Sequence, residues 1–133
     1  MTGPHRILLP EGWPRPKGYV NGIVAKGTSV FLGGQIGWDE KGVFAPDLVG
    51  QVHQALKNIV RLLGEAGTTP QSVVRLTWFV TDLAAYAGDL KAIGKVYRDT
   101  FGAHYPAMTL VQIVALVEPQ ALVEIEATAV LPD

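Results

Sequence analysis

Apolar residues follow a regular helical pattern between positions 47 and 66. They recur at spacings of three and four residues, which places them on one face of an α-helix. Gly67 follows directly and is typical of a helix C-terminus. The sequence therefore predicts an amphipathic helix over Asp47–Ala66. The residues of its apolar face are Leu48, Val52, Ala55, Leu56, Ile59, Leu62 and Leu63.

A second helix is predicted after a loop that begins at Asp82, spanning roughly Tyr86–Phe101. Between the two helices, Thr69-Pro70 predicts a single helical turn, because proline is favoured at the first helical position. Val74–Thr81 is rich in β-branched and aromatic residues and predicts a strand. The inner face of the second helix consists of Leu90, Ile93, Tyr97 and Phe101, with Tyr97 interpreted as a core residue.

Five further strands are predicted outside this central region. Lys26-Gly27 predicts the turn of a hairpin between the second and third of them. Gly33-Gly34 then interrupts the pattern, as expected for a bulge or a close approach of the backbone. The strands are His5–Leu9, Tyr19–Ala25, Ser29–Leu32, Met108–Ala115 and Leu122–Leu131.

Each predicted helix carries one apolar stripe and therefore needs only one face of a sheet to cover. We expect an α+β fold in which a mixed sheet has two helices on one face, within a single domain over residues 1–133. The other face is also expected to be apolar and to pack on neighbouring subunits. The residues that suggest this are Val111, Ile113, Val123, Ile125 and Ala127.

Composition narrows the classes of protein that this chain can belong to. Hydrophobic residues make up 48% and charged residues 17%, which favours an oligomer, although small compact domains can be equally apolar. The net charge is −1 without a basic run, which argues against a nucleic-acid partner. The absence of cysteine excludes disulfides and thiolate catalysis. Neither a leader nor a membrane-spanning run is recognisable, so a cytoplasmic protein without a membrane partner is expected.

The three histidines, His5, His53 and His104, do not point to a hydrolase. None has a serine or acidic neighbour that would complete a nucleophilic triad. Neither His-x-His nor Glu-x-x-His spacing occurs, so no metal and no cofactor is expected.

Two acidic residues are placed more suggestively. Glu124 and Glu126 lie two apart in a predicted strand, so they share one face about 6.5 Å apart, opposite Val123 and Ile125. They form either a solvated strand face or a carboxylate pair at a subunit cleft, where one could act on a substrate nitrogen or a water.

Four segments of the chain resemble one known family. They are Tyr105–Leu110 (YPAMTL), Leu122–Ala127 (LVEIEA), Gly33–Ile36 (GGQI) and Gly18–Gly22 (GYVNG). Together they are similar to the Rid family, the reactive-intermediate deaminases once called YjgF, and the resemblance covers about the whole chain. It implies a chorismate-mutase-like fold and a homotrimer with a central barrel. Each subunit interface would then hold a cleft for a small-molecule ligand.

The resemblance also implies roles for individual residues. Glu124 matches the acidic residue of the family's cleft and is the catalytic candidate, whereas Glu126 is left as a salt-bridge or surface residue. Tyr19 matches a tyrosine that closes over the pocket, although it could equally be a core or interface residue. The backbone beside Gly33 and Gly34 would bind substrate, the alternative being a plain bulge.

The chain departs from the deaminase pattern at four positions of the expected site. Met108 stands where the deaminases carry the arginine that grips a substrate carboxylate, an interaction of about 2–3 kcal/mol. Gly33 replaces a serine, Gly94 an asparagine and Leu110 a cysteine. Met108 and Leu110 are therefore expected to contact a substrate other than the small 2-imino acids.

Three functions stay open at this level. The first is hydrolysis of an imine or enamine with no free carboxylate beside the reacting carbon. The second is non-catalytic binding of a small ligand, or an interaction role, on the Rid trimer scaffold. The third, an endoribonuclease, has neither a basic patch nor an acid–base pair to support it.

Overall fold

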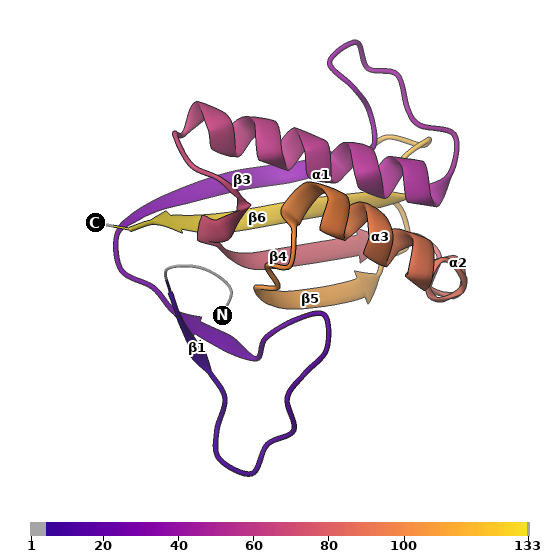
Figure 1. The fold of residues 1–133 in the computed structure, drawn as a ribbon. Helices are drawn as coiled ribbons and strands as arrows, with labels where there is room; N and C mark the ends of the chain where they lie inside the picture. The colour runs from indigo at the N-terminus through magenta and orange to yellow at the C-terminus, as the bar shows by residue number, and fades with distance from the viewer. Residues whose placement is uncertain (1–4, 133) are drawn as a thin grey trace.

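The computed structural model describes residues 5–132 as a four-stranded sheet with helices on one side (Figure 1). A separate two-stranded sheet near the N-terminus lies beside it. The elements in chain order are β1 (Arg6–Leu8), β2 (Gly22–Val24), β3 (Thr28–Ile36), α1 (Leu48–Glu65), a 3₁₀ turn (Pro70–Ser72), β4 (Val73–Val80), α2 (Leu83–Gly88), α3 (Leu90–Phe101), β5 (Ala107–Gln112) and β6 (Val123–Leu131).

The large sheet has the strand order β3-β6-β4-β5. β6 runs antiparallel to both β3 and β4, whereas β4 and β5 are parallel. Parallel neighbours need a crossover connection, which α2 and α3 provide. The predicted α+β fold with a mixed sheet and helices on one face is therefore confirmed.

Helix α1 begins and ends almost where the sequence pattern predicts. The carboxylate of Asp47 accepts a hydrogen bond from the backbone N–H of Gly50 (2.8 Å) and caps the first turn. At the other end Gly67 adopts φ +78°, and the N–H of Thr68 donates to the carbonyl of Leu63 (2.9 Å). This is a Schellman motif, which requires the left-handed conformation that glycine adopts easily.

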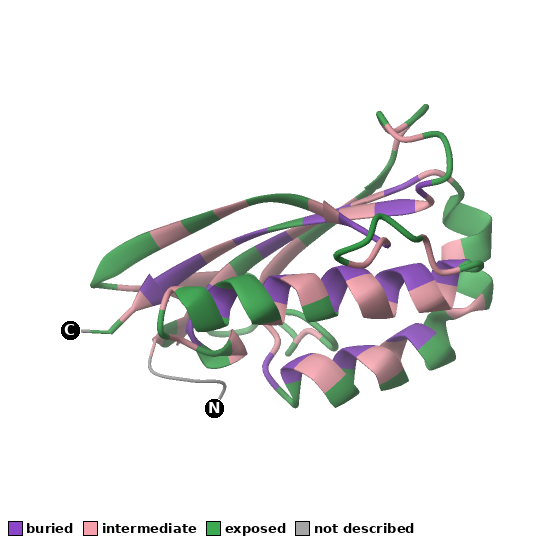
Figure 2. Ribbon diagram, turned by 90° about the horizontal axis from the view of Figure 1, so that it is seen from above, coloured by how far each residue is buried: buried purple, intermediate pink, exposed green. Residues whose placement is uncertain are grey.

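The core lies between this helix layer and one face of the sheet (Figure 2). Strand β6 contributes every second residue to it, from Val123 to Ala129, and all four are buried. The intervening residues Glu124, Glu126 and Thr128 lie on the opposite face, which we call the open face. Strict alternation along β6 therefore separates a fully apolar side from a polar side.

The open face is consequently less apolar than the sequence suggested. Val123, Ile125 and Ala127 all face the helices, so they do not contribute to a second apolar face. Two exposed apolar side chains do lie on the open face, on its two edge strands: Phe31 of β3 (77% exposed), which pairs with Thr128, and Val111 of β5, which is in register with Phe79 and Glu124. The homotrimer with its central barrel stays a prediction.

The predicted hairpin between Tyr19–Ala25 and Ser29–Leu32 is wrong. β2 covers only the second half of the first segment and pairs with β1, whereas β3 pairs with β6 along most of its length. Gly27 has φ +144° and lies against the backbone of Leu131, so the chain passes beside β6 at the point where a hairpin turn was expected.

Other boundaries also differ from the prediction, and β3 continues past the two glycines to Ile36 instead of ending at Leu32. The second helix is two helices, because the chain breaks at Asp89, and α2 starts early since the Asp82 carboxylate caps it through the N–H of Ala85 (3.0 Å). Strand β5 ends at Gln112. Within residues 5–132, no helix is both long enough and apolar enough to cross a membrane.

Candidate functional site

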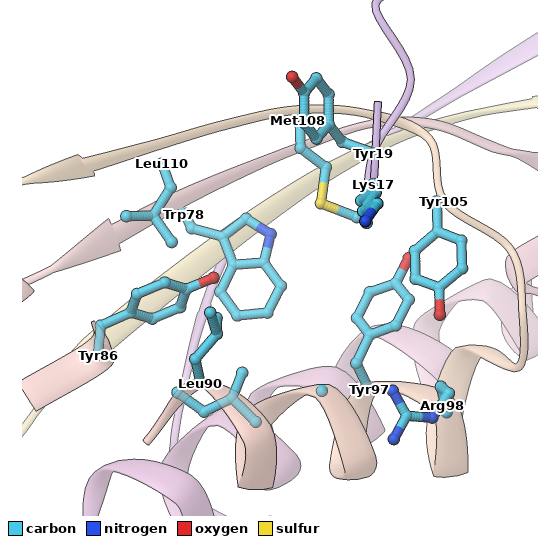
Figure 3. Close-up of a pocket in the computed structure, with 13 residues that line it drawn as sticks. Lys17, Tyr19, Trp78, Tyr86, Leu90, Tyr97, Arg98, Tyr105, Met108 and Leu110 are labelled. Carbon is cyan, nitrogen blue, oxygen red and sulfur yellow. The ribbon is translucent and has the colours of Figure 1, made fainter. Parts of the chain in front are cut away.

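A cavity lies between α3 and the β4–β5 side of the sheet. It has a volume of about 550 Å³, and five aromatic residues line it (Figure 3). This volume falls within the range of about 300–1,000 Å³ that small-molecule sites occupy. We call it the aromatic pocket and define it by Tyr19, Trp78, Tyr86, Tyr97, Tyr105 and Met108.

Tyr97 forms the centre of the aromatic wall. Its ring stacks on Tyr105 with centroids 5.4 Å apart and planes 13° apart, and it lies 6.4 Å from the ring of Trp78. Its hydroxyl donates a hydrogen bond of 2.5 Å to the carbonyl of His104. Burial, together with the neighbouring Tyr105, raises the pKa of Tyr97 well above its ordinary value. Tyr97 is therefore a neutral core residue, as predicted, that also lines the pocket.

Strand pairing explains why Met108 and Leu110 reach this pocket. Met108 pairs with Leu76 and Leu110 pairs with Trp78, so both side chains point to the helix side of the sheet. Tyr19 joins them because the N–H of Val20 donates to the carbonyl of Pro106 (3.1 Å), which ties the N-terminal loop to the start of β5. Tyr19 is 43% exposed at the rim, so it is not a core residue.

The polar and charged groups of the pocket are few. Trp78 is 4% exposed, and its indole Nε1 is buried without a hydrogen-bond partner. A buried donor left unpaired costs about 1–3 kcal/mol. Lys17 and Arg98 also line the pocket, and its lining includes no acidic residue.

Gly34 and Glu124 lie together elsewhere, on the open face. The pairing of β3 with β6 shifts register between Leu32 and Gln35, which confirms the predicted bulge at the two glycines. A side-chain carbon at Gly34 would overlap the Glu124 carboxylate, whereas one at Gly33 would meet open space. We call Gly33, Gly34 and Glu124 the glutamate bulge.

The sheet separates the glutamate bulge from the aromatic pocket. Ile125 pairs with Trp78 and is buried on the helix side, and the adjacent Glu124 must then lie on the open face. The structure thus brings Tyr19, Met108 and Leu110 into one cavity but leaves the predicted catalytic residue on the other side of the sheet. A single chain does not assemble the predicted site.

The remaining candidate residues lie outside both the aromatic pocket and the glutamate bulge. Glu126 is exposed on the open face. The ring Nε2 atoms of His5 and His104 lie 2.9 and 2.7 Å from the carbonyls of Val130 and Val73. In the described part of the chain, no three His, Cys, Asp or Glu side chains gather where they could hold a metal ion.

Sequence reasoning missed Trp78, Tyr86 and Tyr105 as pocket residues, as well as the two cations. The sequence predicts Trp78 only as part of a strand, because its side of the sheet follows from the pairing of β4 with β5. Arg98 lies beside Gly94, which the sequence distinguishes only by the missing asparagine.

Fold and site define this chain as a small α+β domain with a ligand-sized aromatic cavity. The sequence profile of the family described as Endoribonuclease L-PSP matches residues 14–131. A RutC family protein from Pyrococcus horikoshii is 30% identical over 125 residues, covering 92% of this chain and 95% of that protein.

Solved structures agree with these sequence matches. A Rid-family protein of unknown function from Yersinia pestis, YyfB, has a TM-score of 0.84 and 32% identity, covering 98% of this chain and all of that one. RidA from an Antarctic Psychrobacter has a TM-score of 0.69 and 27% identity, covering 95% of this chain and 99% of that one. The chain belongs to the Rid/YjgF family.

Proposed function

We propose that the protein is an imine or enamine deaminase that hydrolyses a C=N bond and releases ammonia. Its substrate has no free carboxylate beside the reacting carbon. The observation that carries this proposal is the close packing of Gly34 against Glu124, which holds a carboxylate beside a strand bulge. Exposed backbone groups at a bulge can bind a substrate nitrogen or a water without any side chain.

The proposed site is completed by a second copy of the chain. The aromatic pocket and the glutamate bulge lie on opposite sides of the same sheet, so they cannot meet within one chain. The aromatic pocket of one subunit would instead face the glutamate bulge of its neighbour. A homotrimer supplies this arrangement three times, since a head-to-tail interface that closes into a ring repeats the same contact. The exposed Phe31, next to the bulge on β3, would be covered in the same interface.

In this site, Glu124 acts as the general base and then as the general acid. The water oxygen bonds to the carbon of the protonated imine, and the C=N electron pair moves to nitrogen. Glu124 takes one proton from the water and passes it to the nitrogen, after which the C–N bond breaks. The remaining hydroxyl proton goes to the released ammonia and leaves a carbonyl product. A well-placed acid–base group of this kind increases the reaction rate about 10²–10⁴-fold.

Met108 determines which substrates the pocket accepts. Its thioether carries no charge and packs against apolar or aromatic surface, and here it lies among tyrosine and tryptophan rings. It cannot hold a carboxylate bidentately as an arginine does. We therefore propose a substrate whose reacting carbon has an apolar neighbour in this position.

A second candidate function is ligand binding without turnover. It is favoured by glycine or leucine at Gly33, Gly94 and Leu110, where the deaminases carry polar side chains, which leaves Glu124 as the one carboxylate among the described residues of the proposed cleft. RNA cleavage has less support, because eleven Lys and Arg are balanced by twelve Asp and Glu and phosphate binding usually needs a basic surface.

The test is ammonia release from the imine that a flavin amine oxidase generates from benzylamine, which has no carboxylate. We expect the protein to speed release above the buffer rate and Glu124→Gln to abolish that gain. Glu126→Gln, one pleat along on the same face, is the matched control and should keep it. An unaltered rate in Glu124→Gln would overturn the mechanism.

A further inference from the structure

The walls of the aromatic pocket are arranged for a flat ligand. Tyr97 and Tyr105 present a stacked pair, and Trp78 meets Tyr86 edge to face at 72° with centroids 6.4 Å apart. In Figure 3 these rings surround a common space above α3. These separations fall in the range of about 4.5–7 Å that aromatic pairs favour, so the rings pack on one another. Their remaining faces and edges line the cavity and can contact the ring of a ligand.

One donor of this pocket has no acceptor in the described residues. The indole Nε1 of Trp78 is buried and unpaired, and Figure 3 shows it on the side of the ring that faces Met108 and Tyr19. Met108 is half-buried, and its thioether lies beside this nitrogen on the side of Tyr19 and Lys17 (Figure 3). Because its side chain is flexible, a ligand can displace it and offer an acceptor to the indole N–H.

The charges around the pocket have one sign. Lys17 and Arg98 line it, and no Asp or Glu does. Gly94 leaves room for Arg98, since a side-chain carbon there would lie 3.3 Å from the guanidinium Nη1. The nearby Lys95 is engaged elsewhere, in an ion pair of 3.0 Å with Asp99. The pocket therefore offers an anion two cationic groups at its edge.

We propose that the aromatic pocket binds a planar aromatic or heteroaromatic acid. Its ring lies among Trp78, Tyr97 and Tyr105, a ring acceptor takes the indole N–H, and its acidic group lies at Arg98 of α3. This proposal rests on the proposed function in one respect: it takes the aromatic pocket to be the cleft of the proposed reaction. The acidic group of such a ligand lies at the edge of the pocket, away from the reacting carbon, whereas a 2-imino acid carries its carboxylate beside that carbon.

The proposed hydrogen bond from the Trp78 indole N–H to a ring acceptor of the ligand is tested by binding alone, without turnover. Quinoline-6-carboxylate and 2-naphthoate have the same shape, but only the first has a ring nitrogen. Isothermal titration should show the quinoline acid bound about five- to tenfold more tightly by the wild type. Trp78→Phe keeps an aromatic ring and removes the donor, so the preference should vanish. Equal wild-type affinities, or a preference that survives Trp78→Phe, would overturn this part.

A second measurement covers the case in which Trp78→Phe does not fold. The indole proton of Trp78 can be followed by NMR, with Trp13→Phe and Trp38→Phe assigning the other two indole signals. Quinoline-6-carboxylate should move the Trp78 signal downfield by more than 2-naphthoate does. An unmoved signal at saturating ligand contradicts the proposed hydrogen bond.

The acidic group is tested with a charge-matched pair of variants. Arg98→Gln should weaken 2-naphthoate about five- to tenfold and leave the neutral 2-naphthamide unchanged. Lys95→Gln removes the same charge from the same helix and should affect neither ligand. Equal binding of acid and amide by the wild type, or a Kd weaker than about 1 mM for both acids, overturns the proposal. If these acids bind but no imine is hydrolysed, only the proposed reaction fails.

Discussion

Gly34 packs so closely against Glu124 that any side chain at position 34 would overlap the carboxylate. The two residues belong to different strands, β3 and β6, and meet only because the β3–β6 pairing shifts register beside the glycines. The bulge thus fixes the position of the one acidic residue proposed to act on substrate.

This contact predicts different outcomes for two neighbouring glycines. Gly34→Ala should push the Glu124 carboxylate aside and abolish the gain in ammonia release, with little cost in unfolding free energy, because the atoms nearest to the added carbon all belong to the flexible Glu124 side chain. Gly33→Ala is the control, because a side-chain carbon there meets open space. Urea unfolding and the benzylamine-imine assay measure both effects. Equal behaviour of the two variants would contradict the geometry.

The pH dependence of stability is predicted from Tyr97. Its pKa is raised by burial and by the adjacent Tyr105, so the folded state keeps the proton that the unfolded chain loses near pH 10. The contribution of Tyr97 to the free energy of unfolding is therefore complete below about pH 10. It falls as the pH rises above about 10, by up to about 1.4 kcal/mol per pH unit. Tyr97→Phe should flatten the decline between pH 10 and 11, as measured by urea unfolding at each pH. A parallel decline in the wild type and the variant would exclude Tyr97 as the cause.

Small 2-imino acids are expected to be poor substrates. An amino-acid oxidase that generates 2-iminobutyrate should release ammonia no faster with this protein present, because Met108 offers the carboxylate no charge. Met108→Arg should gain a small rate, limited by Gly33, Gly94 and Leu110. Rapid release by the wild type would show that Met108 is no obstacle.

A homotrimer is expected, because the aromatic pocket and the glutamate bulge lie on opposite sides of the sheet and need two chains to form one site. Light scattering of the purified protein should give three times the chain mass of 14.3 kDa. Phe31→Asp, placed on the open face where the side chain is 77% exposed, should lower that mass. A mass of one chain for the wild type would exclude the composite site.

Sequence patterns predicted the elements that depend on residues close together in the chain. The stripe of α1, its Asp47 and Gly67 ends, and the alternation that puts Glu124 opposite Ile125 all follow from residues close in sequence. The hairpin at Gly27 failed, because the partner of β3 is a strand about one hundred residues away. Trp78 and Arg98 were missed for the same reason: they line one pocket only because of the α2–α3 crossover and the pairing of β4 with β5.

The most direct test mixes two inactive variants. Glu124→Gln lacks the base, and Met108→Trp fills the pocket. If each site combines one subunit's pocket with a neighbour's Glu124, trimers refolded from an equal mixture regain about one quarter of the sites. Ammonia release from the benzylamine imine should then reach about one quarter of the wild-type gain. A mixture no more active than its parents, or a wild type no faster than buffer, would contradict a site shared between subunits.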